Sequence, residues 1–228
     1  ATGKKFVNYW VHGEHLLVNK KKMSKSLGNF YTLDDLEKKE FNPLSFRYLV
    51  LTTHYRSKLN FTWKGLTAAE SGLHALYHEI ALLKFLEKKI TNFKSPTVAK
   101  ALAGKQISNR SLITNYKKQF AAAINDDLNI SRALAVVWNL IGNKGIRPKN
   151  KVELLFEFDE VLGLRFKEAV KFSRPPAKVG NLVKEREKYR ANKQFVQADR
   201  LRKRVEALGY TIEDTTYGPF VWQDKVKS

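Results

Sequence analysis

The chain has 228 residues, of which 42 are lysine or arginine and 22 are aspartate or glutamate, so its formal net charge is +20. With 43% apolar residues it can bury a substantial core, which excludes a disordered chain. So large a positive excess favours an anionic partner, first of all nucleic acid, because lysine and arginine bind phosphates without regard to sequence. The alternative is a lysine-rich proteome in which the charge reflects only base composition or solubility.

The sequence also lacks two kinds of feature. It contains no cysteine, so neither a disulfide framework nor a cysteine-based metal site can form in this chain. No apolar run approaches the ~20 residues that a membrane-spanning helix needs, and the first residues show no secretory pattern. We therefore expect a cytoplasmic protein without a membrane partner.

The most informative segment follows a short strand predicted at residues 16–18. It sets two ammonium groups three residues apart among hydroxyl groups, and it consists of Lys22, Met23, Ser24, Lys25 and Ser26. Lysines are mobile cations that can follow charge as it moves between phosphate oxygens, and Gly28 lets the backbone turn. The segment therefore predicts a phosphate-binding loop. The alternative is a solvated basic loop that continues the lysine run from Lys20.

Two short helices are predicted next. Thr32, with Asp35 three residues later, is typical of a capped helix start. Asn42 followed by Pro43 predicts the start of a second helix over residues 44–53. The face of that helix expected to pack inward consists of Phe46, Leu49, Val50 and Thr53.

The tripeptide His54-Tyr55-Arg56 ends this block of short elements. Arg56 can grip a phosphate with two hydrogen bonds, so we expect it to contact RNA. The alternative is structural, because basic and aromatic side chains at a helix end often only satisfy its terminal carbonyls.

A long helix is predicted from Thr62 to about residue 90, because apolar residues recur there at helical spacing. His74 and His78 stand four apart on one face and permit a metal in principle. Except for Glu79, which lies off that face, no third ligand stands at a useful spacing, so we expect histidines that face solvent or lie at the edge of the core, and no bound metal.

Three further helices are predicted over residues 111–124, 130–143 and 152–162, the last closed by Gly163. The acidic turn at residues 125–127 resembles a Mg²⁺ site, but caps and turn formers are the preferred interpretation. With the long helix, these segments predict an antiparallel bundle.

A linker is predicted at residues 173–181, where Pro175 and Pro176 end the bundle. Residues 182–192 and 195–208 then predict a helical hairpin rich in bases. The candidate RNA contacts on this hairpin are Arg186, Arg190, Arg200 and Arg204. Part of this charge can instead serve only to solvate a helix.

A β-hairpin is predicted near the end of the sequence, from strand-like residues 210–214 and 220–222 around the turn at 217–219. Trp222 is a further candidate RNA contact, since an exposed aromatic ring can stack on an unpaired base. Packing of the hairpin against the helices is equally compatible with the sequence.

Several of these motifs together resemble cysteinyl-tRNA synthetases, a family of class I aminoacyl-tRNA synthetases. Residues 22–26 resemble the KMSKS loop of that class, and the resemblance extends over most of the chain. One departure is Asn19-Lys20-Lys21, where the family usually has a more acidic or glycine-containing approach to the loop. The other matching segments are residues 9–13, 47–49, 54–57, 59–61, 125–129 and 186–214.

The resemblance implies a role for each residue of the loop. In this family the lysines stabilise the triphosphate while an amino acid attacks the α-phosphate of ATP and pyrophosphate leaves, so Lys22 and Lys25 are the expected catalytic residues. Residues 22–26 together form the expected ATP site, with Mg²⁺ accompanying ATP and Met23 anchoring the loop. The implied partners are cysteine and tRNA(Cys). Zinc is expected in the full-length enzyme, with ligands outside this chain.

The implied fold is mainly α and has three parts. Residues 1–61 form the KMSKS-bearing end of a class I catalytic domain, residues 62–172 an antiparallel helical bundle that binds the anticodon region, and residues 182–228 a small α+β domain for anticodon recognition. We expect a monomer. No HIGH sequence is present and the chain does not begin with an initiator methionine, so we expect the C-terminal portion of a longer enzyme, inactive alone.

Three alternatives remain at this point. Methionyl-tRNA synthetases share the loop. The cysteine-activating ligase of mycothiol synthesis resembles the catalytic half, but it lacks the anticodon domain that residues 180–228 resemble. The third alternative is a freestanding RNA-binding module without catalysis.

Overall fold

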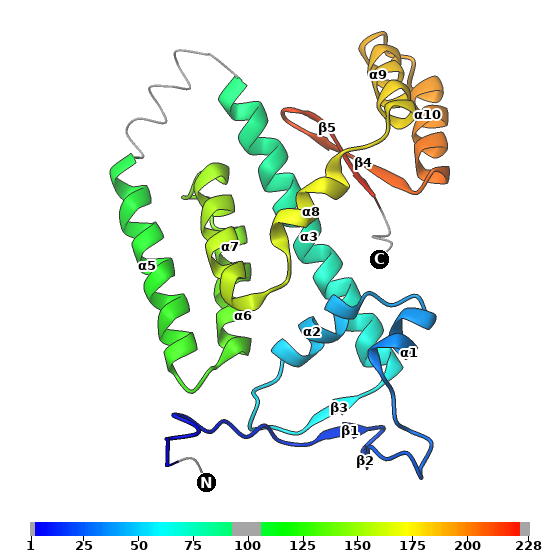
Figure 1. Cartoon of the computed structure of the whole chain (residues 1–228). Helices are drawn as coiled ribbons and strands as arrows, with labels where there is room; N and C mark the ends of the chain where they lie inside the picture. Colours follow the sequence, from blue (N-terminus) through cyan, green and yellow to red (C-terminus); the bar gives the residue numbers. More distant parts are fainter. Residues whose placement is uncertain (1–2, 93–105, 224–228) are drawn as a thin grey trace.

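The computed structural model describes residues 3–92 and 106–223, and this part of the protein is mainly helical (Figure 1). Among these residues, no helix is both long enough and apolar enough to cross a membrane. The elements in chain order are β1 (Leu16–Val18), β2 (Lys21–Lys22), α1 (Leu33–Lys38), α2 (Pro43–Leu51), β3 (Leu59–Phe61), α3 (Trp63–Asn92), α5 (Gln106–Asn125), α6 (Ile130–Gly142), α7 (Pro148–Leu162), α8 (Phe166–Ala169), a 3-10 turn (Val170–Ser173), α9 (Ala177–Ala191), α10 (Phe195–Ala207), β4 (Tyr210–Thr215) and β5 (Gly218–Gln223).

The first part of the chain is a three-stranded sheet with two short helices. The strand order is β2-β1-β3, and β1 runs antiparallel to β2 and parallel to β3. Val18 and Phe61 pack with Leu36 of α1 and Leu66 of α3 in a small core. This core fixes the sheet against the start of α3, so the segment that leaves β2 has a rigid base.

Both predicted helix starts in this part are confirmed. The Thr32 hydroxyl accepts a hydrogen bond from the Asp35 amide, and the Asp35 carboxylate accepts one from the Thr32 amide, so a capping box is present. The Asn42 side chain accepts from the Leu44 amide at 2.8 Å, directly before Pro43. These starts follow from local sequence alone.

The predicted inward face of α2 is partly wrong. Phe46 packs on the small core, but Val50 is 41% exposed, and the fully buried positions are Ser45 and Tyr48. The reason is that α2 lies between two cores: Tyr48 faces the bundle while Phe46 faces the sheet. Leu49 contacts both cores. A single stripe at helical spacing cannot describe a helix that packs on two sides.

The long helix α3 packs on α7 and α6, and α5 packs on the same two helices, so that the four surround the main core (Figure 1). At 30 residues it is about 45 Å long. Phe120 of α5 stacks flat on Phe158 of α7, with ring centroids 3.9 Å apart. Gly163 closes α7 in the left-handed conformation (φ 62°), as predicted, although α7 begins at Pro148, four residues before its predicted start.

The last part of the chain pairs the α9–α10 hairpin with the β4–β5 hairpin, as predicted. Its small core consists of Val179, Leu182, Val183, Leu201, Val205, Ile212 and Val221. The predicted linker is too long, because α9 begins at Ala177, directly after Pro176. Val179 is buried in the small core, and its packing there explains why α9 begins at Ala177 and not at residue 182, where the sequence predicts its start.

Candidate nucleotide loop and nucleic-acid interface

The KMSKS loop, residues 22–26, leaves β2 at Lys22 and leads into a tight turn over residues 25–28. The Gly28 amide donates to the carbonyl oxygen of Lys25 at 3.1 Å, and Gly28 has φ +62°. This left-handed conformation favours glycine. The Ser24 hydroxyl accepts from the Leu27 amide at 3.2 Å and lies 2.9 Å from the Ser26 hydroxyl. The loop is therefore a defined turn and not only a solvated basic stretch.

The charges of the loop point into solvent while its apolar residue points inward. Lys22 and Lys25 are exposed, whereas Met23 is partly buried against the small core beside the sheet. Across residues 3–92 and 106–223 no acidic side chain forms an ion pair with either lysine. The Lys25 ammonium instead lies 5.6 Å from the centre of the Phe30 ring. Both ammonium groups are thus available to an anionic ligand.

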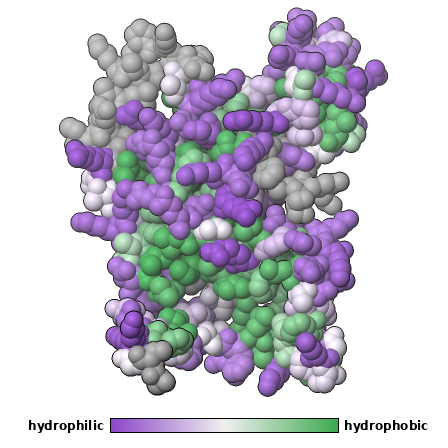
Figure 2. Space-filling model, in the orientation of Figure 1, coloured by the Kyte–Doolittle hydropathy of each residue, from purple (hydrophilic) through white to green (hydrophobic). Residues whose placement is uncertain are grey.

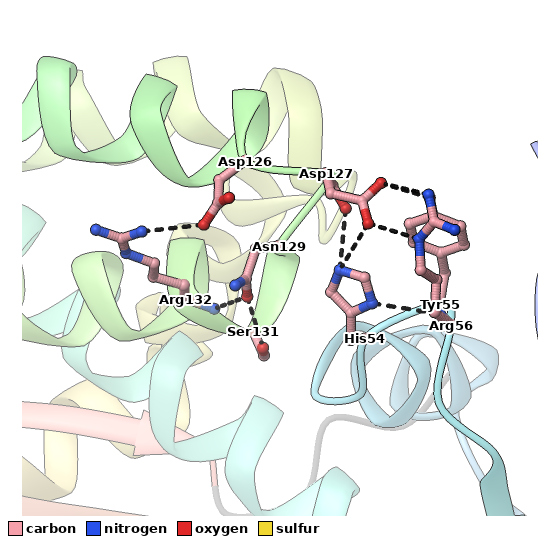
Figure 3. A network of polar contacts seen from close by, with 8 residues as sticks. All are labelled: His54, Tyr55, Arg56, Asp126, Asp127, Asn129, Ser131 and Arg132. Atoms are coloured by element: carbon pink, nitrogen blue, oxygen red, sulfur yellow. Dashed lines mark hydrogen bonds and ion pairs between the residues drawn. The ribbon is translucent and has the colours of Figure 1, made fainter. Parts of the chain in front are cut away.

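Arg56 lies away from this loop, in a network centred on Asp127 (Figure 3). Its guanidinium makes two hydrogen bonds to the Asp127 carboxylate, at 2.6 and 3.1 Å, and the Tyr55 hydroxyl adds a third at 2.6 Å. The His54 ring contacts the Asp127 backbone carbonyl at 3.0 Å. Hydrogen bonds from Arg56 and Tyr55 lower the pKa of Asp127 to about 2. The tripeptide therefore ties the end of α2 to the turn between α5 and α6.

The acidic turn at residues 125–129 forms caps and turns, the preferred sequence interpretation. The Asn129 side chain caps α6 by accepting from the Arg132 amide, and Asp126 pairs with the Arg132 guanidinium at 3.2 Å (Figure 3). Within the described ranges, no group of three or more His, Cys, Asp or Glu side chains is placed to hold a metal ion.

Trp222 is buried, at 4% exposure, so the expectation of an exposed stacking ring is not met. Its ring packs edge-on against His74 and His78 of α3, with centroids 5.2 and 5.5 Å away. His78 also lies 3.2 Å from the Glu213 carboxylate on β4. Trp222 and the two histidines form the contact by which the β-hairpin docks on α3. This packing was the alternative for Trp222 and agrees with the expected place of the histidines at the edge of the core.

Arg186 is also buried, at 2% exposure, and its prediction as an RNA contact is wrong for this conformation. It makes two hydrogen bonds to the Asp214 carboxylate, at 2.9 and 2.8 Å. Arg190 and Arg202 donate to the same carboxylate, and these hydrogen bonds, led by those of Arg186, hold the pKa of Asp214 well below its usual range. The guanidiniums of Arg186 and Arg190 are thus committed to joining α9 to β4.

Both helices of the hairpin carry exposed cations, among them Lys184 and Lys188 on α9 and Arg200 and Arg204 on α10. Arg200 and Arg204 are exposed, as predicted, and hydrophilic side chains cover much of the α9–α10 corner of the molecule (Figure 2). Phe195 and Val196, at the start of α10, are 60% and 65% exposed. Sequence reasoning missed Phe195 as a candidate. Spacing gave no signal, because Phe195 stands three residues before Ala198, in line with the buried stripe of Ala198, Leu201 and Val205.

Comparison with known proteins gives two consistent results. Residues 1–71 match a family model described as the tRNA synthetases class I (C) catalytic domain. Over 224 residues the chain is 37% identical to cysteine–tRNA ligase 1 of Burkholderia lata, which covers 96% of this chain and 42% of that protein.

Two further relatives agree with the first. Identity is 37% over 232 residues to the cysteine–tRNA ligase of Protochlamydia amoebophila and 33% over 238 residues to that of Treponema denticola. These matches cover 96% and 98% of this chain, but only 45% and 47% of the two relatives. The chain thus spans somewhat less than half the length of the curated relatives it matches.

Proposed function

The chain belongs to the cysteine–tRNA ligase family, and from that premise we propose that it is the portion of such a ligase that carries the KMSKS loop and a tRNA-binding surface. The whole enzyme would activate cysteine with ATP and transfer it to tRNA(Cys). Its reaction is the attack of the cysteine carboxylate on the α-phosphate of ATP, which forms an aminoacyl adenylate and releases pyrophosphate. A hydroxyl of the terminal ribose of the tRNA then attacks the carbonyl carbon of the adenylate, which forms the cysteinyl ester and releases AMP.

The observation that carries this proposal is a pair of ammonium groups, Lys22 at the end of β2 and Lys25 in the turn that follows, within the region that matches a class I catalytic domain. Neither forms an ion pair with an acidic side chain in the described part of the chain. Negative charge on the phosphate oxygens grows at the α-phosphate and on the leaving pyrophosphate as the new bond forms. Lys22 and Lys25 can stabilise this charge because their ammonium groups are mobile and already free of acidic partners. Mg²⁺ is expected to accompany ATP. We assign Lys25 the larger effect, because Lys22 adjoins Lys20 and Lys21, which can replace part of its charge.

We further propose that the three parts of the chain have the separate roles that the resemblance to the family implies. Residues 1–61 contribute to nucleotide chemistry, the bundle over residues 62–172 contacts the tRNA, and residues 177–228 approach the anticodon. On α10, exposed Arg200 and Arg204 can bind phosphates, and exposed Phe195 can stack on an unpaired base, worth about 1–3 kcal/mol where it occurs. Arg56 can add a phosphate contact only by sharing or releasing Asp127.

The remaining features of the proposal concern the whole ligase. We propose that zinc selects cysteine there and is bound by residues outside this chain, as the family's use of cysteine ligands implies, since this chain has no cysteine. We propose a monomer that works in the cytoplasm, and we expect this chain by itself not to activate cysteine, because it lacks the HIGH sequence.

Two assays test the proposal. In ATP–pyrophosphate exchange, the longer protein that contains this chain should show cysteine-dependent exchange, and Lys25→Ala should lower it. In binding assays, the 228-residue chain should prefer tRNA(Cys) to a version with a swapped anticodon. Equal affinity and equal salt dependence for the two RNAs would instead support a freestanding, nonspecific RNA-binding module.

A further inference from the structure

We infer that Asn29 is a positioning residue for the KMSKS loop, an inference that rests on the proposed function. Its side-chain amide makes two hydrogen bonds to the backbone of the loop. The carboxamide oxygen accepts from the Ser24 amide at 2.8 Å, and the carboxamide nitrogen donates to the carbonyl of Lys22 at 3.0 Å. Asn29 thus joins the two ends of the segment that precedes the turn.

Asn29 binds the two backbone groups that would otherwise form hydrogen bonds with a neighbouring β-strand. In an extended chain the C=O of one residue and the N–H of the second residue after it point to the same side. Strand β2 ends at Lys22, so no strand partner continues the ladder to Ser24. The Asn29 amide takes the place of that partner and keeps residues 22–24 extended beyond the end of the sheet.

An extended segment fixes where each side chain of the loop points, because successive side chains alternate between faces. Met23 points inward and packs against the small core, while Lys22, on the other face, is exposed and Ser24 is half-buried. The turn that carries Lys25 then begins where the Asn29 clamp ends. The positions of both ammonium groups therefore depend on the backbone conformation of the loop, which the side-chain amide of Asn29 stabilises.

Only an amide of this length supplies an acceptor and a donor at the required separation. Asn29→Asp is nearly isosteric and keeps the acceptor for the Ser24 amide, but it turns the donor into a second oxygen facing the Lys22 carbonyl. Asn29→Ala removes both bonds. The matched control is Asn143→Ala in the bundle, where the Asn143 amide likewise accepts from a backbone amide, that of Gly145, and donates to the Tyr116 hydroxyl.

Two measurements test the inference. In the 228-residue chain, Asn29→Ala and Asn29→Asp should speed hydrogen exchange of the Ser24 amide, about tenfold or more for Asn29→Ala, while Asn143→Ala leaves it unchanged. In the longer protein, both Asn29 variants should lower kcat of cysteine-dependent ATP–pyrophosphate exchange about tenfold, with KM for ATP changed less than threefold. A purely structural role would instead leave kcat per folded molecule unchanged, as expected of Asn143→Ala.

The outcomes separate this inference from the proposed function. If the parent is inactive, or if Lys25→Ala leaves exchange unchanged, the proposed function is overturned. If the parent and Lys25→Ala behave as proposed but both Asn29 variants keep the parent kcat, only the positioning role is overturned. Parental exchange of the Ser24 amide in Asn29→Ala would show that the clamp does not hold the loop. Asn29→Asp serves as the decisive variant should Asn29→Ala fold poorly.

Discussion

Replacing Asp214 by asparagine should destabilise the last part of the chain by about 2–3 kcal/mol. The Arg186 side chain that it pairs with is only 3% exposed, and breaking a buried ion pair by removing one partner costs about 3–5 kcal/mol. The Asp214 side chain is 37% exposed, so water can take over part of its role, which places the expected loss below that range. Arg190 and Arg202 lose the same carboxylate.

The assay is urea denaturation followed by circular dichroism at pH 7. A matched control is Asp126→Asn, which breaks an ion pair whose two side chains are 60% and 59% exposed and should change the free energy of unfolding by less than about 1 kcal/mol. Because the folded state lowers the pKa of Asp214, its contribution is full above the ordinary carboxyl pKa and is lost progressively as the pH falls from there to the lowered pKa of the folded state. The parent and Asp214→Asn should therefore converge in acid. A loss at pH 7 as small as that of Asp126→Asn would refute the reasoning.

Two further substitutions probe contacts between distant segments. Gly163→Ala should cost about 1–2 kcal/mol, because a non-glycine residue is strained at φ +62° and its Cβ would lie 2.8 Å from the Arg47 guanidinium, which urea denaturation would measure. His78→Gln should reduce the pH dependence of stability at and above the ordinary histidine pKa of about 6.5. Hydrogen bonding to Glu79 and the charge of Glu213 raise the pKa of His78, so in the parent this stabilisation is full below about pH 6.5 and lost as pH rises through the raised pKa.

Gly163→Ala is compared with a second glycine substitution, and His78→Gln is compared with the parent protein. Gly142→Ala, at an exposed helical glycine with open space around its Cβ, should be neutral or slightly stabilising. A Gly163→Ala protein as stable as Gly142→Ala would contradict the proposed strain. For His78→Gln, an unfolding free energy that varies with pH as steeply as that of the parent would show that the pair with Glu213 does not couple the hairpin to α3.

Features that depend on a few neighbouring residues could be predicted from the sequence. The capping box of Thr32 and Asp35 and the glycine stop at Gly163 are set by hydrogen bonds and backbone angles within one turn. The KMSKS loop could be predicted for the same reason, since its lysines, serines and glycine are consecutive. The helical content of the fold and the terminal β-hairpin follow from periodicity.

Features that depend on pairing across the chain could not be predicted. Arg186 looks like an exposed helical cation until β4 brings Asp214, 28 residues later, against it. Trp222 looks like a free aromatic until the hairpin docks on His74 and His78. Arg56 reaches Asp127 across 71 residues. In each case the residue type determines which contacts the side chain can make. Only the tertiary fold determines whether another part of the chain already makes those contacts.

The most direct test of the account is cysteine-dependent ATP–pyrophosphate exchange by the longer protein that contains this chain, compared with its Lys25→Ala variant. We predict robust exchange in the parent and a loss of about 100-fold or more in the variant, equivalent to about 2.7 kcal/mol of transition-state stabilisation. No exchange with cysteine, or an equal rate in both proteins, would contradict the assignment of this loop to the phosphates of ATP.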